Sequence, residues 1–284
     1  MKNKNIYITK ASGKKELFDG RKIYRTAIRA GASNQLAKET EQEIEKKLEP
    51  NISSNKILNY ALEYLKNKEK TVAIKYNLKR GIMELGPSGY PFEKYVGMIL
   101  KEYGYAVQLN QQIQGHCLTY EIDVLAEKEN KIFVVECKYY NRPGLRSNSK
   151  VALYTYARFL DIKKHWTEKL NKPCNPCKGL LVTNTKCTTD AIKYAKCVGM
   201  EIIGWHYPEK QGLEHLIEQK KLYPITSFPS LKKQIKDQLI SNDVILIKDL
   251  LNLNIEKLAQ KSGIPIKELQ VLKNTAQNIY KNNN

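Results

Sequence analysis

Two apolar-rich segments, which a short charged connection at 128–131 separates, each contain charged side chains at positions that could do chemistry. Asp123 interrupts the first segment, and Glu136 and Lys138 interrupt the second. Both segments are rich in β-branched residues, so the pattern predicts a β-hairpin. Successive side chains of a strand point to opposite faces, which puts Glu136 and Lys138 on one face and Cys137 on the other.

Charges inside an apolar strand cost free energy unless they are paired or bound to a metal. Two carboxylates and an ammonium that meet on a sheet suit a hard divalent cation such as Mg²⁺, with the lysine beside the attacking water. We therefore expect Asp123, Glu136 and the backbone carbonyl of Cys137 to bind Mg²⁺, and Lys138 to orient or polarise the hydroxide. A solvated salt bridge on a surface hairpin is the alternative interpretation.

The order of Asp123 and then Glu136-x-Lys138 on the next strand resembles the PD-(D/E)xK nuclease superfamily and, more closely, the Mrr-type restriction endonucleases. The resemblance spans residues 89–208. The sequences that carry it are Phe92-Glu93-x-x-Val96, Gly104-Tyr105, Glu121-Ile122-Asp123-Val124, Val135-Glu136-Cys137-Lys138, Leu181-Val182-Thr183-Asn184 and Gly204-Trp205.

This resemblance implies a restriction-endonuclease-like mixed sheet flanked by helices, in an α/β (α+β multidomain) chain. It implies Mg²⁺-dependent hydrolysis of phosphodiester bonds in double-stranded DNA by a type IV (Mrr-like) enzyme that restricts foreign or modified DNA. It also implies an accessory catalytic carboxylate at Glu93, for which stabilisation of a helix dipole is the alternative role. Mrr-like enzymes often act as dimers, so a homodimer or higher homo-oligomer is expected.

The segment around these residues also predicts the elements that position them. Late in the segment strands alternate with helices, which predicts a mixed sheet with a parallel portion. A helix is predicted over 150–162, with Val151, Tyr154 and Leu160 as candidates for its buried face.

Basic and aromatic residues follow the second strand of the hairpin, namely Tyr139, Tyr140, Arg142, Arg146 and Lys150. This mixture suits a track for DNA phosphates. A mobile loop with ordinary surface charges is the alternative.

The composition favours a polyanionic partner. The 284 residues include 48 Lys and Arg against 29 Asp and Glu, a formal net charge of +19. Each phosphate that a basic protein neutralises releases counterions, which favours nucleic acid, although a lysine-rich solvated surface gives the same numbers. No apolar run is long enough to span a membrane, and no apolar segment follows the N-terminus as in a signal peptide. We therefore expect a cytoplasmic protein with no membrane partner.

Six cysteines without a secretion signal predict reduced thiols. Cys174 and Cys177 form a Cys-x-x-Cys pair, which invites a zinc interpretation. A structural zinc site needs four ligands, usually as two close pairs, and Cys187 and Cys197 do not form the second pair. Zinc is therefore the disfavoured interpretation.

The first 85 residues predict a short β-hairpin followed by four helices. Asp19 is the predicted N-cap of the first helix, and Ser53 or Ser54 caps the third. The fourth helix is predicted over 71–83. Two or three compact units fit the chain length, and we expect domains at 1–85, 86–224 and 225–284, because Gly and Pro are concentrated at 86–91.

The hairpin with its helices resembles an ATP-cone, the nucleotide-sensing module of ribonucleotide reductases and their repressor. The residues that carry this resemblance are Thr9-Lys10-x-x-Gly13, Glu16, Asp19, Lys22-Ile23 and Val72-Ala73-x-x-Tyr76. It implies a site for ATP or dATP formed by Lys10, Gly13, Glu16, Asp19, Lys22 and Ser54. Because the chain lacks Gly-x-x-x-x-Gly-Lys-Ser/Thr, such a nucleotide would act as an effector and not as a hydrolysed substrate. The sequence departs from the cone at Ala11 and Leu58, so a degenerate cone kept for dimerisation or DNA docking is the alternative.

The last segment, 225–284, predicts helices around the turn Gly263-Ile264-Pro265. It resembles a helix-hairpin-helix, which offers backbone N–H groups to DNA phosphates without reading sequence. A small helical packing domain is the alternative. For the whole chain, the rival functions are a nucleotide-responsive DNA-binding regulator that does not cleave, and a DNA repair or junction nuclease.

Overall fold

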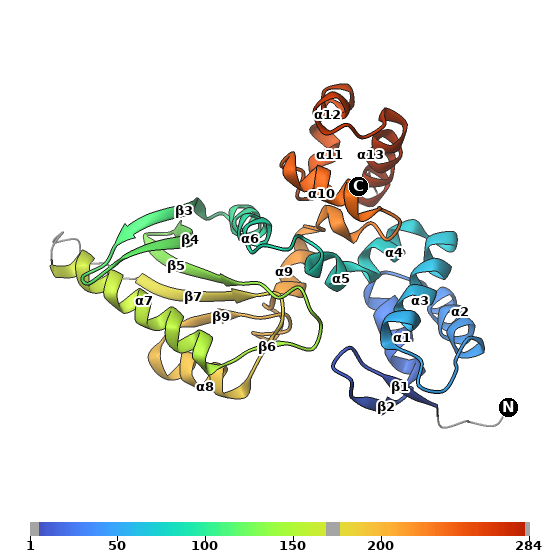
Figure 1. Cartoon of the computed structure of the whole chain (residues 1–284), viewed down its shortest axis with the longest axis horizontal. Coiled ribbons are helices and arrows are strands. Elements are labelled where there is room, and N and C mark those ends of the chain that lie inside the picture. Colours follow the sequence, from blue (N-terminus) through green and yellow to red (C-terminus); the bar gives the residue numbers. More distant parts are fainter. Residues whose placement is uncertain (1–5, 169–176, 282–284) are drawn as a thin grey trace. The chain divides into compact units, whose positions relative to one another are not determined.

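The computed structural model describes residues 6–168 and 177–281. The chain divides into two compact units, one formed by Met83–Leu222 and the other by Met1–Ile82 together with Tyr223–Asn284 (Figure 1). The three-domain division at 1–85, 86–224 and 225–284 stays a prediction, because compactness alone does not show which segments fold independently.

The unit 83–222 is built on a five-stranded mixed sheet with the order β3-β4-β5-β7-β9. Its strands are β3 (Ala106–Gln114), β4 (Thr119–Lys128), β5 (Lys131–Lys138), β7 (Cys177–Thr183) and β9 (Glu201–Ile203). β3, β4 and β5 pair antiparallel, whereas β5, β7 and β9 pair parallel. The predicted hairpin is β4–β5, and the predicted mixed sheet with a parallel portion is confirmed.

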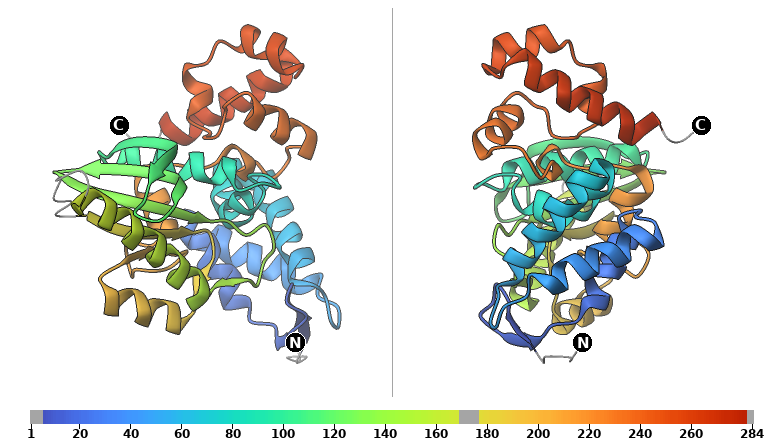
Figure 2. Two further views of the ribbon diagram at one scale, coloured as in Figure 1. Left: turned by 60° about the vertical axis from the view of Figure 1, so that its left-hand side comes forward. Right: turned by 90° about the vertical axis from the view of Figure 1, so that its right-hand side faces the viewer.

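Helices cover both faces of this sheet, which agrees with the predicted α/β class and with a restriction-endonuclease-like architecture. They are α6 (Tyr90–Glu102), α7 (Ser149–Glu168), α8 (Thr189–Val198) and α9 (Leu213–Lys220). Figure 2 (left) shows α7 and α8 on one side of the sheet, while α6 packs on β3 and β4 and against α9. A short parallel pair, β6 (Arg146–Ser147) with β8 (Lys186–Cys187), lies outside the main sheet.

The buried face of α7 differs from the predicted one. Tyr154 and Leu160 are exposed, so their prediction as core residues is wrong. The helix instead buries Ala152, Thr155, Phe159 and Ile162. Because Tyr and Leu both occur often at partly exposed positions, their spacing alone did not fix the phase of the helix.

The N-terminal part of the other unit starts with a two-stranded hairpin and continues with helices, as predicted. The elements are β1 (Tyr7–Thr9), β2 (Lys15–Leu17), α1 (Gly20–Arg29), α2 (Asn34–Lys46), α3 (Ser54–Lys68), α4 (Lys70–Tyr76) and α5 (Leu78–Met83). Asp19 caps α1 and Ser53 caps α3 through side-chain hydrogen bonds. The predicted helix 71–83 is divided at Asn77, whose side chain donates to the backbone carbonyl of Ser227 (3.1 Å).

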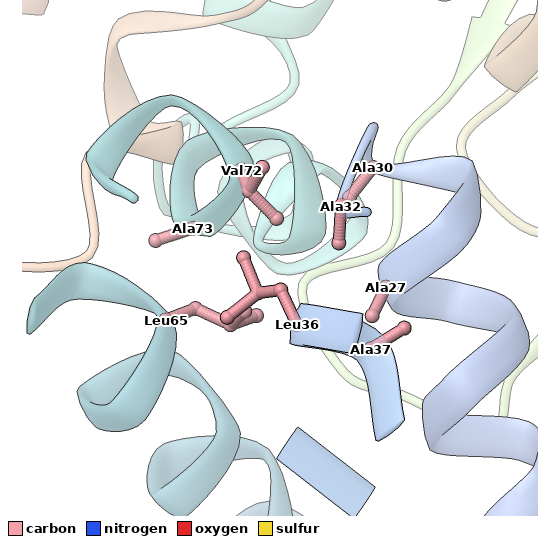
Figure 3. Close-up of a cluster of buried hydrophobic side chains, with 8 residues drawn as sticks. All are labelled: Ala27, Ala30, Ala32, Leu36, Ala37, Leu65, Val72 and Ala73. Atoms are coloured by element: carbon pink, nitrogen blue, oxygen red, sulfur yellow. The ribbon is translucent and has the colours of Figure 1, made fainter. Parts of the chain in front are cut away.

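Small side chains let these helices approach closely. Ala27, Ala30, Ala32 and Ala37 pack with Leu36, Leu65, Val72 and Ala73 in one buried cluster (Figure 3). Alanine also favours the helical backbone itself. Local propensity and packing therefore agree in this part of the chain.

The C-terminal part of the same unit is helical: η1 (Ile225–Ser227), α10 (Lys233–Ser241), α11 (Asp249–Asn252), α12 (Ile255–Ser262) and α13 (Ile266–Lys281). Gly263 ends α12 with φ 71°, a left-handed conformation that glycine adopts without strain. The helices predicted on either side of the Gly263-Ile264-Pro265 turn are present, and the resemblance to a helix-hairpin-helix stays a prediction. In the described residues no helix is long and apolar enough to cross a membrane.

Gly81 shows how closely the two parts of this unit pack. A Cβ atom at Gly81 would lie 2.8 Å from the Cα atom of Ser227, and Thr226 Oγ1 donates to the Gly81 carbonyl (2.5 Å). Since backbone atoms cannot move aside cheaply, Gly81→Ala should lower the free energy of unfolding by about 1–3 kcal/mol. Urea denaturation followed by circular dichroism measures this loss. The exposed helix variant Glu63→Ala is the control, and equal stability of the two variants would contradict the packing.

Candidate active site

Strand pairing is interrupted on both sides of Asp123. The β4–β5 ladder ends at the pair Val124 and Val135, one position before Asp123 and Glu136 would pair. The β3–β4 ladder skips the position that joins Asn110 to Asp123. Asn110 has φ 52°, a left-handed conformation. The sheet therefore opens at the carboxylate that the sequence predicts as a metal ligand.

Asp123 uses its side chain where the ladder is missing. The backbone N–H of Cys137 donates to Asp123 Oδ2 at 2.6 Å. This hydrogen bond ties β4 to the end of β5, next to Glu136. It fixes the carboxylate of Asp123 beside the strand that carries the other charged residues.

One cavity collects the residues predicted for catalysis. It has a volume of about 390 Å³, and its lining consists of Pro87, Gly89, Glu93, Asp123, Glu136, Cys137, Lys138, Tyr139, Tyr140 and Asn141. The two strands and the first turn of α6 thus bring Glu93, Asp123, Glu136 and Lys138 to one place. Their roles in catalysis stay predictions.

Glu93 reaches the cavity from the first turn of α6. The Phe92 and Tyr139 rings lie 5.5 Å apart, which joins α6 to the segment after β5. Tyr139 also donates to the carbonyl of Met83, the last residue of α5 (2.6 Å). Burial raises the pKa of Glu93 to about 7, and the charge of Asp123 adds to this shift. A carboxylate that served only the helix dipole would not need such a desolvated place.

The two strand carboxylates are also desolvated. Burial raises the pKa of Glu136 to about 7, and the charge of Asp123 raises it further against the opposing effects of Arg158 and Lys138. Burial likewise raises the pKa of Asp123, although the hydrogen bond from Cys137 works against the shift. Negative charge at this place is therefore incompletely compensated by the protein.

Lys138 is exposed at the end of β5. Its Nζ lies 6.0 Å from the centre of the Tyr140 ring, and in the described part of the chain no ion pair engages it. Asn184 holds Tyr140 in place, because its side chain accepts from the Tyr140 N–H (2.9 Å) and donates to the Tyr140 carbonyl (2.7 Å). The ammonium is therefore available to an anion in the cavity.

Arg158 of α7 is a site residue that the sequence patterns did not indicate. Its Nη1 donates to Glu136 Oε2 and its Nη2 donates to the carbonyl of Glu121. The guanidinium lies 5.4 Å and 5.3 Å from the ring centres of Tyr120 and Tyr154. The sequence did contain a hint of this contact, because Tyr154 and Arg158 are four residues apart and such residues are neighbours on a helix. It became meaningful only once the phase of α7 was known.

The oxygen atoms at this site are of the chemical type that binds a hard divalent cation. Asp123 and Glu136 offer carboxylate oxygens, and the Cys137 backbone offers a carbonyl oxygen, which are ligand types that Mg²⁺ prefers. The negative charge at these two half-buried carboxyls, which the protein compensates only in part, is what such a cation would neutralise. Over residues 6–168 and 177–281, three or more His, Cys, Asp or Glu side chains do not converge on a metal position. The predicted metal set, which uses a backbone carbonyl as its third ligand, stays a prediction.

The raised pKa values of Glu93 and Glu136 predict a pH effect on the metal-free protein. Both exceed the ordinary value of 4.5, so the folded state binds more protons than the unfolded state between about pH 4.5 and 7. Stability should therefore fall as the pH rises through this range. Glu93→Gln should flatten the fall, measured by urea unfolding in chelator from pH 5 to 8. The exposed variant Glu127→Gln is the control, and an unchanged slope in Glu93→Gln would refute the effect.

The residues predicted for a nucleotide lie around the N-terminal hairpin. Glu16 forms ion pairs with Lys10 (2.7 Å) and Lys22 (3.0 Å), so these three predicted residues do come together. Their mutual pairing lowers the pKa of Glu16, chiefly through the hydrogen bond from Lys10. Nucleotide binding is not shown by this arrangement.

The other three predicted nucleotide residues have local roles in the structure. Gly13 adopts φ 80° in the hairpin turn. Asp19 caps α1 and pairs with Arg21 (2.8 Å). Ser54 is the first residue of α3, and the neighbouring Ser53 bridges to Thr9 of the hairpin. Ser54 therefore lies close to the hairpin in the fold.

Four cysteines in the described residues are free, at positions 117, 137, 187 and 197, as predicted. Cys177 is disulfide-bonded, so the prediction of reduced thiols is wrong for this residue. Cys174, which completes the Cys-x-x-Cys pair, lies outside the described residues.

Comparisons with known proteins agree with the geometry of the sheet and the cavity. Residues 86–208 match a restriction endonuclease family, Mrr_cat, and residues 223–280 match a family described as AF1548-like, C-terminal. Neither match includes the predicted cone at 1–85. The fold and the match thus define a restriction-endonuclease-like domain at 86–208.

Two similar proteins show the family to which the chain belongs. An uncharacterized protein of Archaeoglobus fulgidus is 40% identical over 162 residues, which cover 57% of this chain and 87% of that protein. The crystal structure of a protein of unknown function, AF1548, is similar with a TM-score of 0.57 and 36% identity, covering 68% of this chain and 98% of that chain. The chain belongs to the AF1548-like family and carries an Mrr-type nuclease domain.

Proposed function

We propose that this protein is a Mg²⁺-dependent DNA endonuclease that hydrolyses phosphodiester bonds. The observation that carries the proposal is the cavity in which Glu93, Asp123, Glu136 and Lys138 meet, within a domain that matches restriction endonucleases. A surface hairpin with a solvated salt bridge would not gather four ionisable side chains from two strands and a helix in one cavity.

Asp123, Glu136 and the Cys137 carbonyl would hold the Mg²⁺ ion, which when bound supplies Lewis-acid polarisation and lowers the pKa of water. Lys138 contributes a positive charge beside the reacting phosphate, where negative charge grows in the transition state. Glu93, with a pKa of about 7, is suited to exchange a proton at neutral pH. Each residue thus receives a role that its position and charge support.

DNA would be held by the basic and aromatic segment after β5. Arg142 and Arg146 are exposed there, a few residues beyond Lys138. Phosphate contacts position the duplex without reading its sequence. This arrangement supports DNA as the substrate. Restriction of foreign or modified double-stranded DNA is the role that we propose for the enzyme.

Reversing these two charges gives a test of the DNA track. The double variant Arg142→Glu/Arg146→Glu should raise the KM for DNA and reduce the slope of log affinity against log salt by about 1 for each lost contact. Fluorescence anisotropy on a short duplex at several salt concentrations measures the slope. The control Lys101→Glu/Lys131→Glu changes two exposed lysines of the same unit. Equal slopes for both double variants would contradict the proposed track.

We further propose that ATP or dATP binds at the N-terminal hairpin as an effector. The convergence of Lys10 and Lys22 on Glu16 supports this proposal, because a triphosphate could replace the carboxylate as their partner. Calorimetric titration of each nucleotide tests it. Binding that is lost in Lys10→Met/Lys22→Met would support the site, whereas absence of binding to the unaltered protein would reject it.

The type IV assignment, the choice between methylated and plain DNA, and a homodimer belong to the same proposal. Plasmid cleavage with Mg²⁺, on methylated and unmethylated DNA and with or without ATP and dATP, tests both the nuclease activity and its regulation by nucleotides. Cleavage confined to branched DNA would favour the repair or junction nuclease. Specific DNA binding without cleavage on any of these substrates would favour the regulator.

A further inference from the structure

The guanidinium of Arg158 joins the two strands of the candidate active site. Nη1 donates to Glu136 Oε2 on β5, and Nη2 donates to the backbone carbonyl of Glu121 on β4. The backbone ladder between these strands ends at Val124 and Val135. Arg158 therefore links β4 and β5 beyond the point where their backbone pairing stops.

This link lies next to the hydrogen bond between Asp123 and Cys137. The Asp123 carboxylate is fixed on one side by the Cys137 N–H, and the Glu136 carboxylate is fixed on the other by Arg158. Among the described residues, Arg158 is the side chain that pairs with Glu136 at the opened end of the sheet. Arg158 thus controls one carboxylate of the pair.

The guanidinium itself is held tightly. Its side chain is only 12% exposed, and the rings of Tyr120 and Tyr154 lie 5.4 Å and 5.3 Å from it. Arginine stacks on aromatic rings and presents its donors in a rigid fork, so this position limits its motion. Its Nε is buried without a hydrogen-bond partner among the described residues. A buried donor without a partner costs free energy, so the other contacts of Arg158 must offset this cost.

We propose that Arg158 is a positioning residue that fixes Glu136 relative to Asp123, so that the two carboxylates can bind one divalent cation. This inference rests on the proposed function, since it concerns the same site. Arg158 occupies Oε2 of Glu136, which leaves Oε1 for the cation. Carboxylate ligands are commonly oriented by such outer hydrogen bonds.

The positive charge of Arg158 has an opposite effect, because it repels a cation that approaches Glu136. Removal of the side chain therefore gives different results for the two effects. If Arg158 positions Glu136, its removal weakens cation binding. If its charge dominates, removal strengthens cation binding.

The test is calorimetric titration of the full-length protein with Mn²⁺, which reports on the site without requiring catalysis. Arg158→Met should bind Mn²⁺ about 10–100-fold more weakly than the unaltered protein. Arg158→Lys keeps the charge but loses the fork, and should lie between the two. Lys163→Met removes an exposed cation from the same helix, and should bind like the unaltered protein.

The outcomes separate this inference from the proposed function. Unchanged or tighter Mn²⁺ binding by Arg158→Met overturns the positioning role, while the metal site itself stands. Absence of Mn²⁺ binding by the unaltered protein overturns the proposed function and the positioning role with it. Circular dichroism checks the fold of each variant. If Arg158→Met does not fold, Arg158→Gln and Arg158→Lys decide, and either one binding as tightly as the unaltered protein overturns the inference.

Discussion

Asp123→Asn is expected to slow DNA cleavage severely and to weaken divalent cation binding. The substitution keeps the size of the side chain and an oxygen that can accept the Cys137 N–H (2.6 Å). It removes the negative charge that a Mg²⁺ ion would neutralise. Electrostatic effects of a bound metal on a transition state are worth several kcal/mol, so the rate should fall by about 10³-fold or more.

The expected loss has two independent measurements. Mn²⁺ calorimetry reports the affinity for the cation, and single-turnover cleavage of a labelled duplex reports the rate. The control is Glu127→Gln, which neutralises an exposed carboxylate on the same strand, β4. If Asp123→Asn cleaved DNA at the unaltered rate, Asp123 would not be a metal ligand.

Lys138→Met is expected to lower kcat by about 10²–10³-fold while leaving cation binding nearly intact. The ammonium lies at the cavity without an ion-pair partner in the described residues, and its Nζ lies 6.0 Å from the Tyr140 ring centre. Its charge is therefore not needed to hold the fold together. It would act on the negative charge that develops at the phosphate during hydrolysis.

The separation of kcat from metal affinity is what distinguishes Lys138 from the carboxylates. Steady-state kinetics on a DNA duplex at saturating Mg²⁺ measures the first quantity, and Mn²⁺ calorimetry measures the second. Lys131→Met alters an exposed lysine at the other end of the same strand and serves as the control. A fall in Mn²⁺ affinity with unchanged kcat would assign Lys138 to metal-site structure and not to catalysis.

The hairpin and its charges could be predicted because they are local. β-branched runs, a short connection and the alternation of side chains placed Asp123, Glu136 and Lys138 on two adjacent strands, and they line one cavity. The first-turn position of Glu93 followed from the proline and the apolar spacing of α6. These features depend on a few neighbouring residues.

The remaining features depend on contacts between distant segments. Arg158 meets Glu136 across 22 positions of the chain, and only the packing of α7 decides which of its faces touches the sheet. Tyr154 was assigned to the buried face, yet it is 58% exposed and stacks on Arg158. Asparagine is one of the residues that adopts a left-handed conformation, as Asn110 does opposite the interruption of the ladder at Asp123. The residue type alone does not show that the ladder is interrupted there.

The N-terminal hairpin shows the same limit. The resemblance to the cone predicts that Lys10, Glu16 and Lys22 surround a nucleotide, and in the structure the two lysines form ion pairs with Glu16. Whether these side chains bind a nucleotide or only pair with one another depends on the free energy of nucleotide binding. The spacing of the residues in the sequence does not predict that free energy. The resemblance to a nucleotide-sensing cone therefore stays a prediction.

The most direct test of the nuclease proposal is a time course of supercoiled plasmid with Mg²⁺, comparing the unaltered protein with Glu136→Gln. We expect the unaltered protein to convert the plasmid to open-circular and linear forms, with activity lost in chelator. Glu136→Gln, which removes the charge but nearly preserves the shape of the side chain, should leave the plasmid supercoiled. Cleavage at the same rate by both proteins would contradict the assignment of this cavity as the active site.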